Sequence, residues 1–196
     1  MKVLFVVFGL LVAVAPVGAQ LVDNGTFDST VDGWDEFPKG TIVWDPLDIS
    51  SSSSSGSALI TNESLTSGDA SGPQQCVTGI VGGQEYLVEA SVYFPGSQSQ
   101  SGWTRLLIRW YSDICFGTQL GLDTTPKAST PDMWSTTGLF VEAPTGAVAV
   151  ALRLDVWKVE AGGALSAHFD NMILDGVVFR DDFESENLDA WSEVVP

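Results

Sequence analysis

Hydrophobic and polar residues alternate along several short segments of this chain. A period of two, carried by β-branched and aromatic residues, is typical of β-strands that bury one face. Glycine, proline, serine and threonine separate the segments, and Pro144-Thr145-Gly146 predicts a turn between two of them. The expected strands are residues 41–44, 57–61, 86–94, 104–112, 138–143, 147–157 and 169–174, with 177–179 as a candidate extension.

Helical periodicity is nearly absent from the sequence. About eight short strands separated by turns predict an all-β sandwich or barrel. The 196 residues, less a leader of 19, fit one domain with a proper core.

The first 19 residues have the pattern of a secretory signal peptide. Met1-Lys2 gives a positive start, an apolar run follows to Val14, and Val17-Gly18-Ala19 provides small residues for cleavage after Ala19. The alternative is a membrane anchor, but the run is shorter than the roughly 20 apolar residues that span a bilayer. We therefore expect a secreted protein, extracellular or in the cell envelope, with no membrane insertion.

The charge is strongly acidic, with 25 Asp and Glu against 8 Lys and Arg and a net charge of −17. Such a surface repels nucleic acid and anionic membranes, which excludes them as partners, and it favours calcium and neutral or cationic partners. Cys76 and Cys115 predict one disulfide in an exported chain, with a reactive or metal-binding thiol pair as the alternative.

Four segments together resemble bacterial carbohydrate-binding modules found on cellulases and xylanases. They are Leu21-Val22-Asp23-Asn24-Gly25-Thr26-Phe27-Asp28 with Gly33-Trp34, then Ser57-Ala58-Leu59, Gly83-Gln84-Glu85-Tyr86 with the strand to Phe94, and Ala167-His168-Phe169-Asp170-Asn171-Met172-Ile173-Leu174. The resemblance covers about residues 21–178. It implies a galactose-binding-like jelly-roll β-sandwich of two antiparallel sheets, a binding module over residues 20–178 and a buried Trp34. Residues 179–196 are expected to form a short acidic tail.

The same resemblance implies a structural calcium site where the first strand meets the last. Its side-chain ligands would be Asp28 and Asp170, with backbone carbonyls around Asn24 completing the shell. Calcium takes six to eight oxygen ligands, which carboxylates and carbonyls supply. Alternatively, Asp28 is a turn residue and Asp170 lies at a strand edge.

Alternation also predicts which side chains face a ligand. The apolar sets of the strands 86–94, 104–112 and 147–157 should point inward, Leu106, Ile108, Trp110 and Val148 among them. If these strands share one sheet, as in the family, its outer face carries Tyr93, Tyr111 and Trp157 among Glu89, Arg109, Arg153 and Asp155. Sugars stack their C–H faces on aromatic rings and hydrogen-bond to Arg and carboxylate groups. The alternative is an ordinary solvated face with cross-strand salt bridges. Trp103, after a polar loop, is the best loop candidate for contact.

No constellation in the sequence supports catalysis. A Ser-His-Asp triad would need His168, the single histidine, and no nucleophile-elbow sequence exposes a serine. We therefore expect a non-catalytic bacterial module that binds a polysaccharide or oligosaccharide. The alternative is a cell-surface or self-associating structural or adhesion protein with the same fold.

Overall fold

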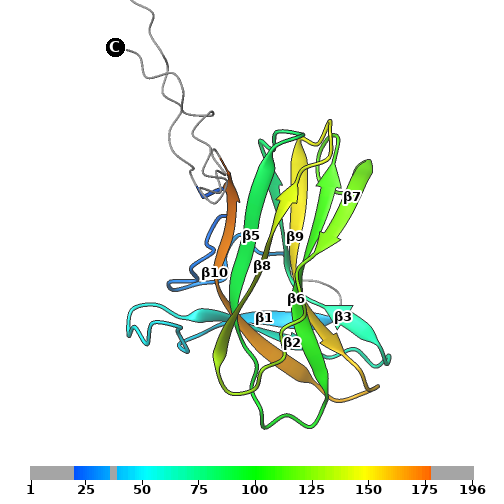
Figure 1. Cartoon of the computed structure of the whole chain (residues 1–196). Helices are drawn as coiled ribbons and strands as arrows, with labels where there is room; N and C mark the ends of the chain where they lie inside the picture. Colours follow the sequence, from blue (N-terminus) through cyan, green and yellow to red (C-terminus); the bar gives the residue numbers. More distant parts are fainter. Residues whose placement is uncertain (1–19, 36–38, 178–196) are drawn as a thin grey trace, which may run out of the picture.

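The computed structural model describes residues 20–35 and 39–177, and the chain in these ranges forms two antiparallel sheets packed face to face (Figure 1). The strands are β1 Gly40–Asp45, β2 Ser57–Asn62, β3 Asp69–Ser71, β4 Gln74–Thr78, β5 Glu85–Tyr93, β6 Gly102–Tyr111, β7 Gln119–Thr124, β8 Trp134–Glu142, β9 Ala149–Lys158 and β10 Leu165–Gly176. The predicted all-β sandwich is confirmed. The predicted signal peptide and acidic tail lie outside the described residues. Within those residues, no helix is long and apolar enough to cross a membrane.

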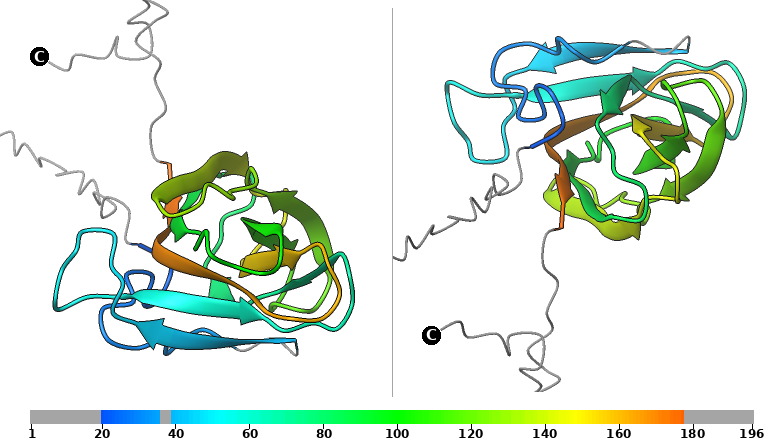
Figure 2. Two further views of the ribbon diagram at one scale, coloured as in Figure 1. Left: turned by 90° about the horizontal axis from the view of Figure 1, so that it is seen from below. Right: turned by 90° about the horizontal axis from the view of Figure 1, so that it is seen from above.

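One sheet, here the β5 sheet, has the order β1-β2-β10-β5-β8, and the other, the β9 sheet, has the order β3-β9-β6-β7. In the β9 sheet, β4 also pairs with β9. Figure 2 shows β1 and β2, in blue and cyan, along one side of the sandwich. The sequence pattern missed β3, β4 and β7, because these strands are short or mostly polar.

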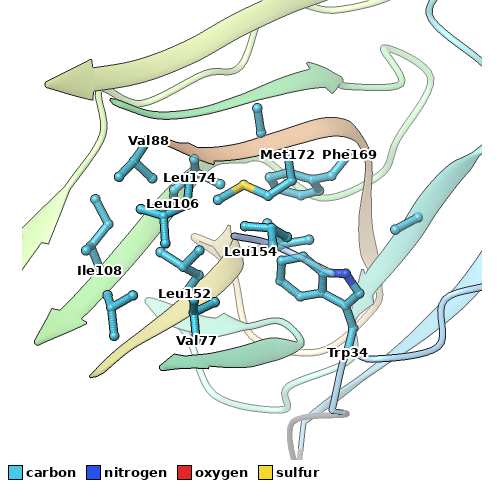
Figure 3. Close-up of a cluster of buried hydrophobic side chains, with 14 of the residues drawn as sticks. Trp34, Val77, Val88, Leu106, Ile108, Leu152, Leu154, Phe169, Met172 and Leu174 are labelled. Atoms are coloured by element: carbon cyan, nitrogen blue, oxygen red, sulfur yellow. The ribbon is translucent and has the colours of Figure 1, made fainter. Parts of the chain in front are cut away.

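The core lies between the two sheets and is built from the inward faces of β1, β2, β4, β5, β6, β9 and β10, with β8 packed against them (Figure 3). The predicted inward residues Leu106, Ile108 and Trp110 have no exposed surface, and full burial of such side chains stabilises by about 1.5–3 kcal/mol each. Trp34 is also buried, as predicted, and packs against Phe27 with 5.7 Å between ring centroids. The labelled side chains are Trp34, Val77, Val88, Leu106, Ile108, Leu152, Leu154, Phe169, Met172 and Leu174.

Val148 was predicted to point into the core, and this is wrong. Its side chain is 44% exposed, because β9 begins one residue later, at Ala149, and Val148 belongs to the end of the preceding turn. The following inward residues of β9 are buried as predicted.

A β-bulge interrupts β10. The register with β5 shifts between Asp170 and Ile173, and Asn171 has a φ of 48°. Phe169 before the bulge and Met172 within it are both buried in the core, although they are three residues apart. Because of the extra residue, the inward side chains in the second half of β10 still reach the core. Asp170 lies on the outer side of the β5 sheet.

The predicted disulfide between Cys76 and Cys115 is confirmed, with 5.8 Å between the Cα atoms. Cys76 lies in β4 and Cys115 lies between β6 and β7. Since β9 separates β4 from β6, the bridge crosses over β9. The small side chains of Ala149 and Ala151 form a buried cluster with Cys115 and Tyr111 at this crossing.

Candidate functional site

The three strands expected to share one outer face do not lie in one sheet. Tyr93 and Glu89 are on β5, whereas Tyr111 and Trp157 are on β6 and β9 of the opposite sheet. The prediction of a single surface is therefore wrong. Alternation every two residues fixes which side of a strand is buried, but strands of either sheet have the same alternation. The pattern alone thus cannot assign a strand to a sheet.

The remaining predicted residues do gather on one surface, the outer face of the β9 sheet. Antiparallel pairing of β6 with β9 places Trp103 opposite Trp157 and Arg105 opposite Asp155. Side chains at paired positions point to the same side of a sheet. We call this surface the β9 outer face. It consists of Trp103, Arg105, Leu107, Arg109 and Tyr111 from β6, Ala149, Ala151, Arg153, Asp155 and Trp157 from β9, and Gln74 from β4.

Two indole rings dominate one end of this face. Trp103 and Trp157 are stacked, with 5.1 Å between ring centroids and 8° between ring planes, and both are partly exposed. Lys127 Nζ lies 4.3 Å from the Trp103 ring centroid, and the Arg105 guanidinium carbon lies 5.1 Å from it. Trp103 was expected in a loop, but it lies in β6, directly paired with β9. Its position on a strand holds it more rigidly than a loop would.

A network of charged side chains adjoins the indole pair. Asp155 has no exposed surface and accepts hydrogen bonds from Arg105 Nε, at 3.3 Å, and from Arg153 Nε. The sequence predicted these groups on an outer face open to a ligand or, alternatively, to solvent, yet Arg153 is only 8% exposed. Burial is tolerated here because each charge has an opposite partner, whereas an isolated buried charge would be very costly.

Arg109 is less well compensated than the other two arginines. Burial and the positive charge of Arg153 both lower the pKa of Arg109, and Asp155 partly opposes them. Among the described residues, Arg109 has no ion-pair partner within 4.0 Å. Tyr111, the next residue of β6 on the same face, is buried beside the disulfide and offers a ligand little surface.

Gln74 contributes an unused acceptor. Its Oε1 atom is buried and has no hydrogen-bond partner among the described residues, and Gln74 is paired in register with Arg153. Buried polar atoms are nearly always hydrogen-bonded, so such an atom on a polar face is suited to a ligand hydroxyl.

The outer face of the β5 sheet carries a second aromatic group. Tyr93 lies 5.7 Å from Trp134 and 5.8 Å from His168, measured between ring centroids. The three residues are on β5, β8 and β10 at paired positions. Glu89 lies on the same strand and face as Tyr93. The predicted residues therefore divide between two opposite surfaces.

His168 does not form a Ser-His-Asp triad with its neighbours. Ser57 Oγ lies 3.0 Å from Nδ1 and Asp45 Oδ1 lies 3.9 Å from the same nitrogen. A triad needs the serine and the carboxylate at opposite nitrogens, with the serine accessible, and Ser57 is fully buried. Burial also lowers the pKa of His168, against the opposing effect of Asp45.

Asp28 and Asp48 both lie within electrostatic range of Asp170, beside the bulge of β10. Asp170 is 1% exposed, and burial, with smaller contributions from Asp48 and Asp28, raises its pKa to about 6. Asp48 accepts hydrogen bonds from Ser50 Oγ and the Ser52 amide, which hold its pKa below the usual value. The predicted pair Asp28 and Asp170 is thus brought together, and Asp48 is a carboxylate that sequence reasoning missed. An aspartate two residues before a serine run was the available signal.

Asn24 faces a different set of partners. Its side-chain amide donates to the carbonyls of Thr30 and Asp32, and its own carbonyl accepts from Trp34 Nε1 at 3.3 Å. In the described residues, no three His, Cys, Asp or Glu side chains form a group that could hold a metal ion by themselves. A cation at Asp28 and Asp170 would need backbone carbonyls as further ligands.

A hollow of about 420 Å³ lies at the ends of β1 and β2. Its lining residues are Lys39, Gly40, Glu63, Ser64, Leu65 and Thr66. Lys39 and Ser64 both already bind Asp69, so the hollow offers few free polar groups. It includes no residue of the β9 outer face.

The two sheets and their strand order define the jelly-roll fold of carbohydrate-binding modules, as predicted. The chain superimposes on the CBM22-1 xylan-binding domain of Paenibacillus barcinonensis Xyn10C with a TM-score of 0.61 and 13% identity, covering 85% of this chain and 99% of that domain. It superimposes on the C-terminal family 22 module of Clostridium thermocellum Xyn10B with a TM-score of 0.58 and 19% identity, covering 80% of this chain and 94% of that module.

The fold also matches part of a larger protein. The enzymatically active domain of bacteriophage CBA120 tailspike protein 4 gives a TM-score of 0.59 at 16% identity, over 81% of this chain but only 21% of that one. No model of a protein family matches the sequence, and no curated protein matches it. At these identities the likeness establishes the fold.

Proposed function

We propose that this protein is a non-catalytic module that binds a polysaccharide or oligosaccharide on its β9 outer face. The observation that carries the proposal is the stacked pair Trp103 and Trp157 beside the network of Arg105, Arg153 and Asp155. Indole rings offer apolar surface to sugar C–H groups, and fixed polar side chains offer partners to hydroxyls. The fold it shares with xylan-binding modules supports the same function.

The geometry of the indole pair limits how a sugar can approach. The two rings cover each other's inner faces, and Lys127 lies over Trp103. A sugar ring therefore packs against the ring edges or the outer side of Trp157. Gln74 Oε1, on the same face, supplies an acceptor for a sugar hydroxyl.

The test is retention on polysaccharides by Trp157→Ala. We expect the variant to lose glycan binding while it keeps its melting temperature within a few degrees, because Trp157 is partly exposed. Screening the wild type on a glycan array first identifies the ligand used for the comparison.

Trp134→Ala is the matched control, since Trp134 belongs to a similar aromatic pair on the opposite face. Loss of binding in this control alone, with Trp157→Ala unaffected, would move the site to the β5 sheet and to Tyr93. Loss of folding in Trp157→Ala would call for the smaller change Trp157→Phe.

We further propose that calcium stabilises the module at Asp28 and Asp170, with Asp48 nearby. The environment of Asp170 supports this proposal. Its carboxylate is buried and lies near two other carboxylates, and both effects raise the free energy of the ionised form. A divalent cation would offset that repulsion, and its hard oxygen ligands are the kind present here. Bound calcium would raise the melting temperature by mass action, and no change on adding calcium after chelation would refute the site.

We also propose that the protein is exported from the cell. The disulfide of Cys76 and Cys115 supports this, because such bonds persist mainly in oxidising compartments. N-terminal sequencing of protein from the culture medium or cell envelope should begin at Gln20. Detection only inside the cell, with residues 1–19 attached, would contradict export.

A self-associating role is the second candidate, and the observation that favours it is the edge strand β7. Leu120 and Leu122 of this strand are 40% and 52% exposed, and Ile114 and Phe116 in the preceding loop are more exposed still. Exposed apolar edge strands can pair with another chain. Sedimentation of the wild type and of Leu122→Lys distinguishes this role, because only a self-associating protein would shift to a smaller species.

A further inference from the structure

Positive charge in this acidic protein is concentrated at one place. The described residues contain six Lys and Arg side chains, of which Arg105, Arg109 and Arg153 lie on the β9 outer face and Lys127 lies over Trp103. The other two are engaged elsewhere. Lys39 pairs with Asp69, and the fully buried Lys158 donates to backbone carbonyls.

Carboxylates do not balance these four cations. Five strands form this sheet: β3, β4, β6, β7 and β9. Among their described residues, the strand register places one acidic side chain on this face, that of Asp155. Asp35, paired with Gln74 in an isolated bridge, adds one exposed carboxylate at the rim. Asp155 is already shared between Arg105 and Arg153. The face therefore keeps an excess of positive charge.

Arg109 is the group that this excess leaves open to a ligand. It is half-buried near Arg153 and has no carboxylate within ion-pair distance in the described chain. A guanidinium matches a carboxylate or sulfate group with two parallel hydrogen bonds. Partial burial strengthens such a pair relative to one in water.

We infer that the β9 outer face binds an anionic glycan, whose sugars carry carboxylate or sulfate groups, with Arg109 as the partner of the acidic group. This inference rests on the proposed function and specifies its ligand class. The sugar ring contacts the indole pair while its acidic group reaches Arg109 and the other cations. Acidic residues elsewhere on the protein oppose this only weakly at physiological salt, because charges more than about 8 Å away are largely screened.

The test compares polygalacturonate fragments with the same fragments after chemical reduction of their carboxyl groups. Calorimetry at about 0.15 M salt, with chelator present, measures both ligands. We expect the acidic form to bind at least about tenfold more tightly, since a hydrogen-bonded charge pair usually contributes that much. A sulfated galactan and its desulfated form make a second arm, which distinguishes sulfate from carboxylate as the recognised group.

Arg109→Gln should abolish the preference for the acidic form while leaving affinity for the reduced form unchanged. Lys39→Gln is the control, because it removes the same charge from a position outside the face. Equal or tighter binding of the neutral forms in both arms would overturn the inference and leave the proposed function standing. Absence of binding to any glycan would refute both. Binding of acidic glycan that needs calcium and survives in Arg109→Gln would also overturn it, since calcium would then bridge two acidic surfaces.

Discussion

Arg153 and Asp155 are two positions apart on β9 and form an ion pair on the outer side of the sheet, where both are buried. Asp155 is shared between two arginines, because Arg105 binds its second carboxylate oxygen. Asp155→Asn would leave two guanidinium groups facing each other without compensation. We expect a loss of about 3–5 kcal/mol in the free energy of unfolding, measured with urea.

Arg105→Gln serves as the comparison for this prediction. The side chain of Arg105 is 23% exposed, so its removal leaves Asp155 still paired with Arg153 and should cost about 1 kcal/mol. Equal losses for the two variants would show that Asp155 does not hold the network together.

The contribution of Asp170 to the stability of the calcium-free protein should fall as the pH rises from about 4 to about 6. Asp170 has a pKa of about 6 in the folded protein, against about 3.9 in an unfolded chain, so the folded state holds its proton more tightly. Above that pH range the Asp170 carboxylate is ionised, and the folded state bears the full free-energy cost of a buried charge. Asp170→Asn should therefore melt at a higher temperature than the wild type near pH 7.5 in chelator.

The same variant gives two internal checks. Near pH 4 most of its advantage should disappear, because Asp170 is then protonated in the folded wild type and about half protonated in the unfolded chain. With calcium added at neutral pH the order should reverse, since Asp170→Asn lacks a proposed ligand. Identical melting temperatures of variant and wild type at both pH values in chelator would contradict the shift in pKa.

Lys158 joins two loops through its buried ammonium group. Its Nζ donates to the carbonyls of Ser64, Gly162 and Gly163, and the side chain has no exposed surface. Lys158→Met would leave these carbonyls without their hydrogen-bond donor. We expect the free energy of unfolding to fall by about 3 kcal/mol. Denaturant titration measures this, with the exposed Lys39→Met expected to change by less than about 1 kcal/mol. A loss no larger than that of the control would rule out this role.

Much of the fold could be read from the sequence, because burial imposes a period of two on β5, β6 and β9. The bulge of β10 was missed, although Phe169 and Met172, three residues apart, do not fit uninterrupted alternation. The site was harder to predict, since its residues come from strands whose sheet depends on chain connections. Tyr93 and Trp157 have the same local pattern and lie on opposite surfaces. Burial of Asp155 was equally hidden, because it depends on two arginines, one of them fifty residues away.

The strap that Cys76 and Cys115 form over β9 bears on how the module would respond to mechanical load. If the chain is pulled from its two ends, the 39 positions between the cysteines cannot extend while the bridge is intact. At about 3.4 Å per residue, that segment hides about 130 Å of length. β5 and β6 lie within this closed covalent loop. When a module is stretched between a surface and a glycan in flowing liquid, the segments outside the loop therefore unfold and extend, while β5 and β6 stay inside it. Stretching single molecules with and without reductant should reveal the hidden length as a second extension.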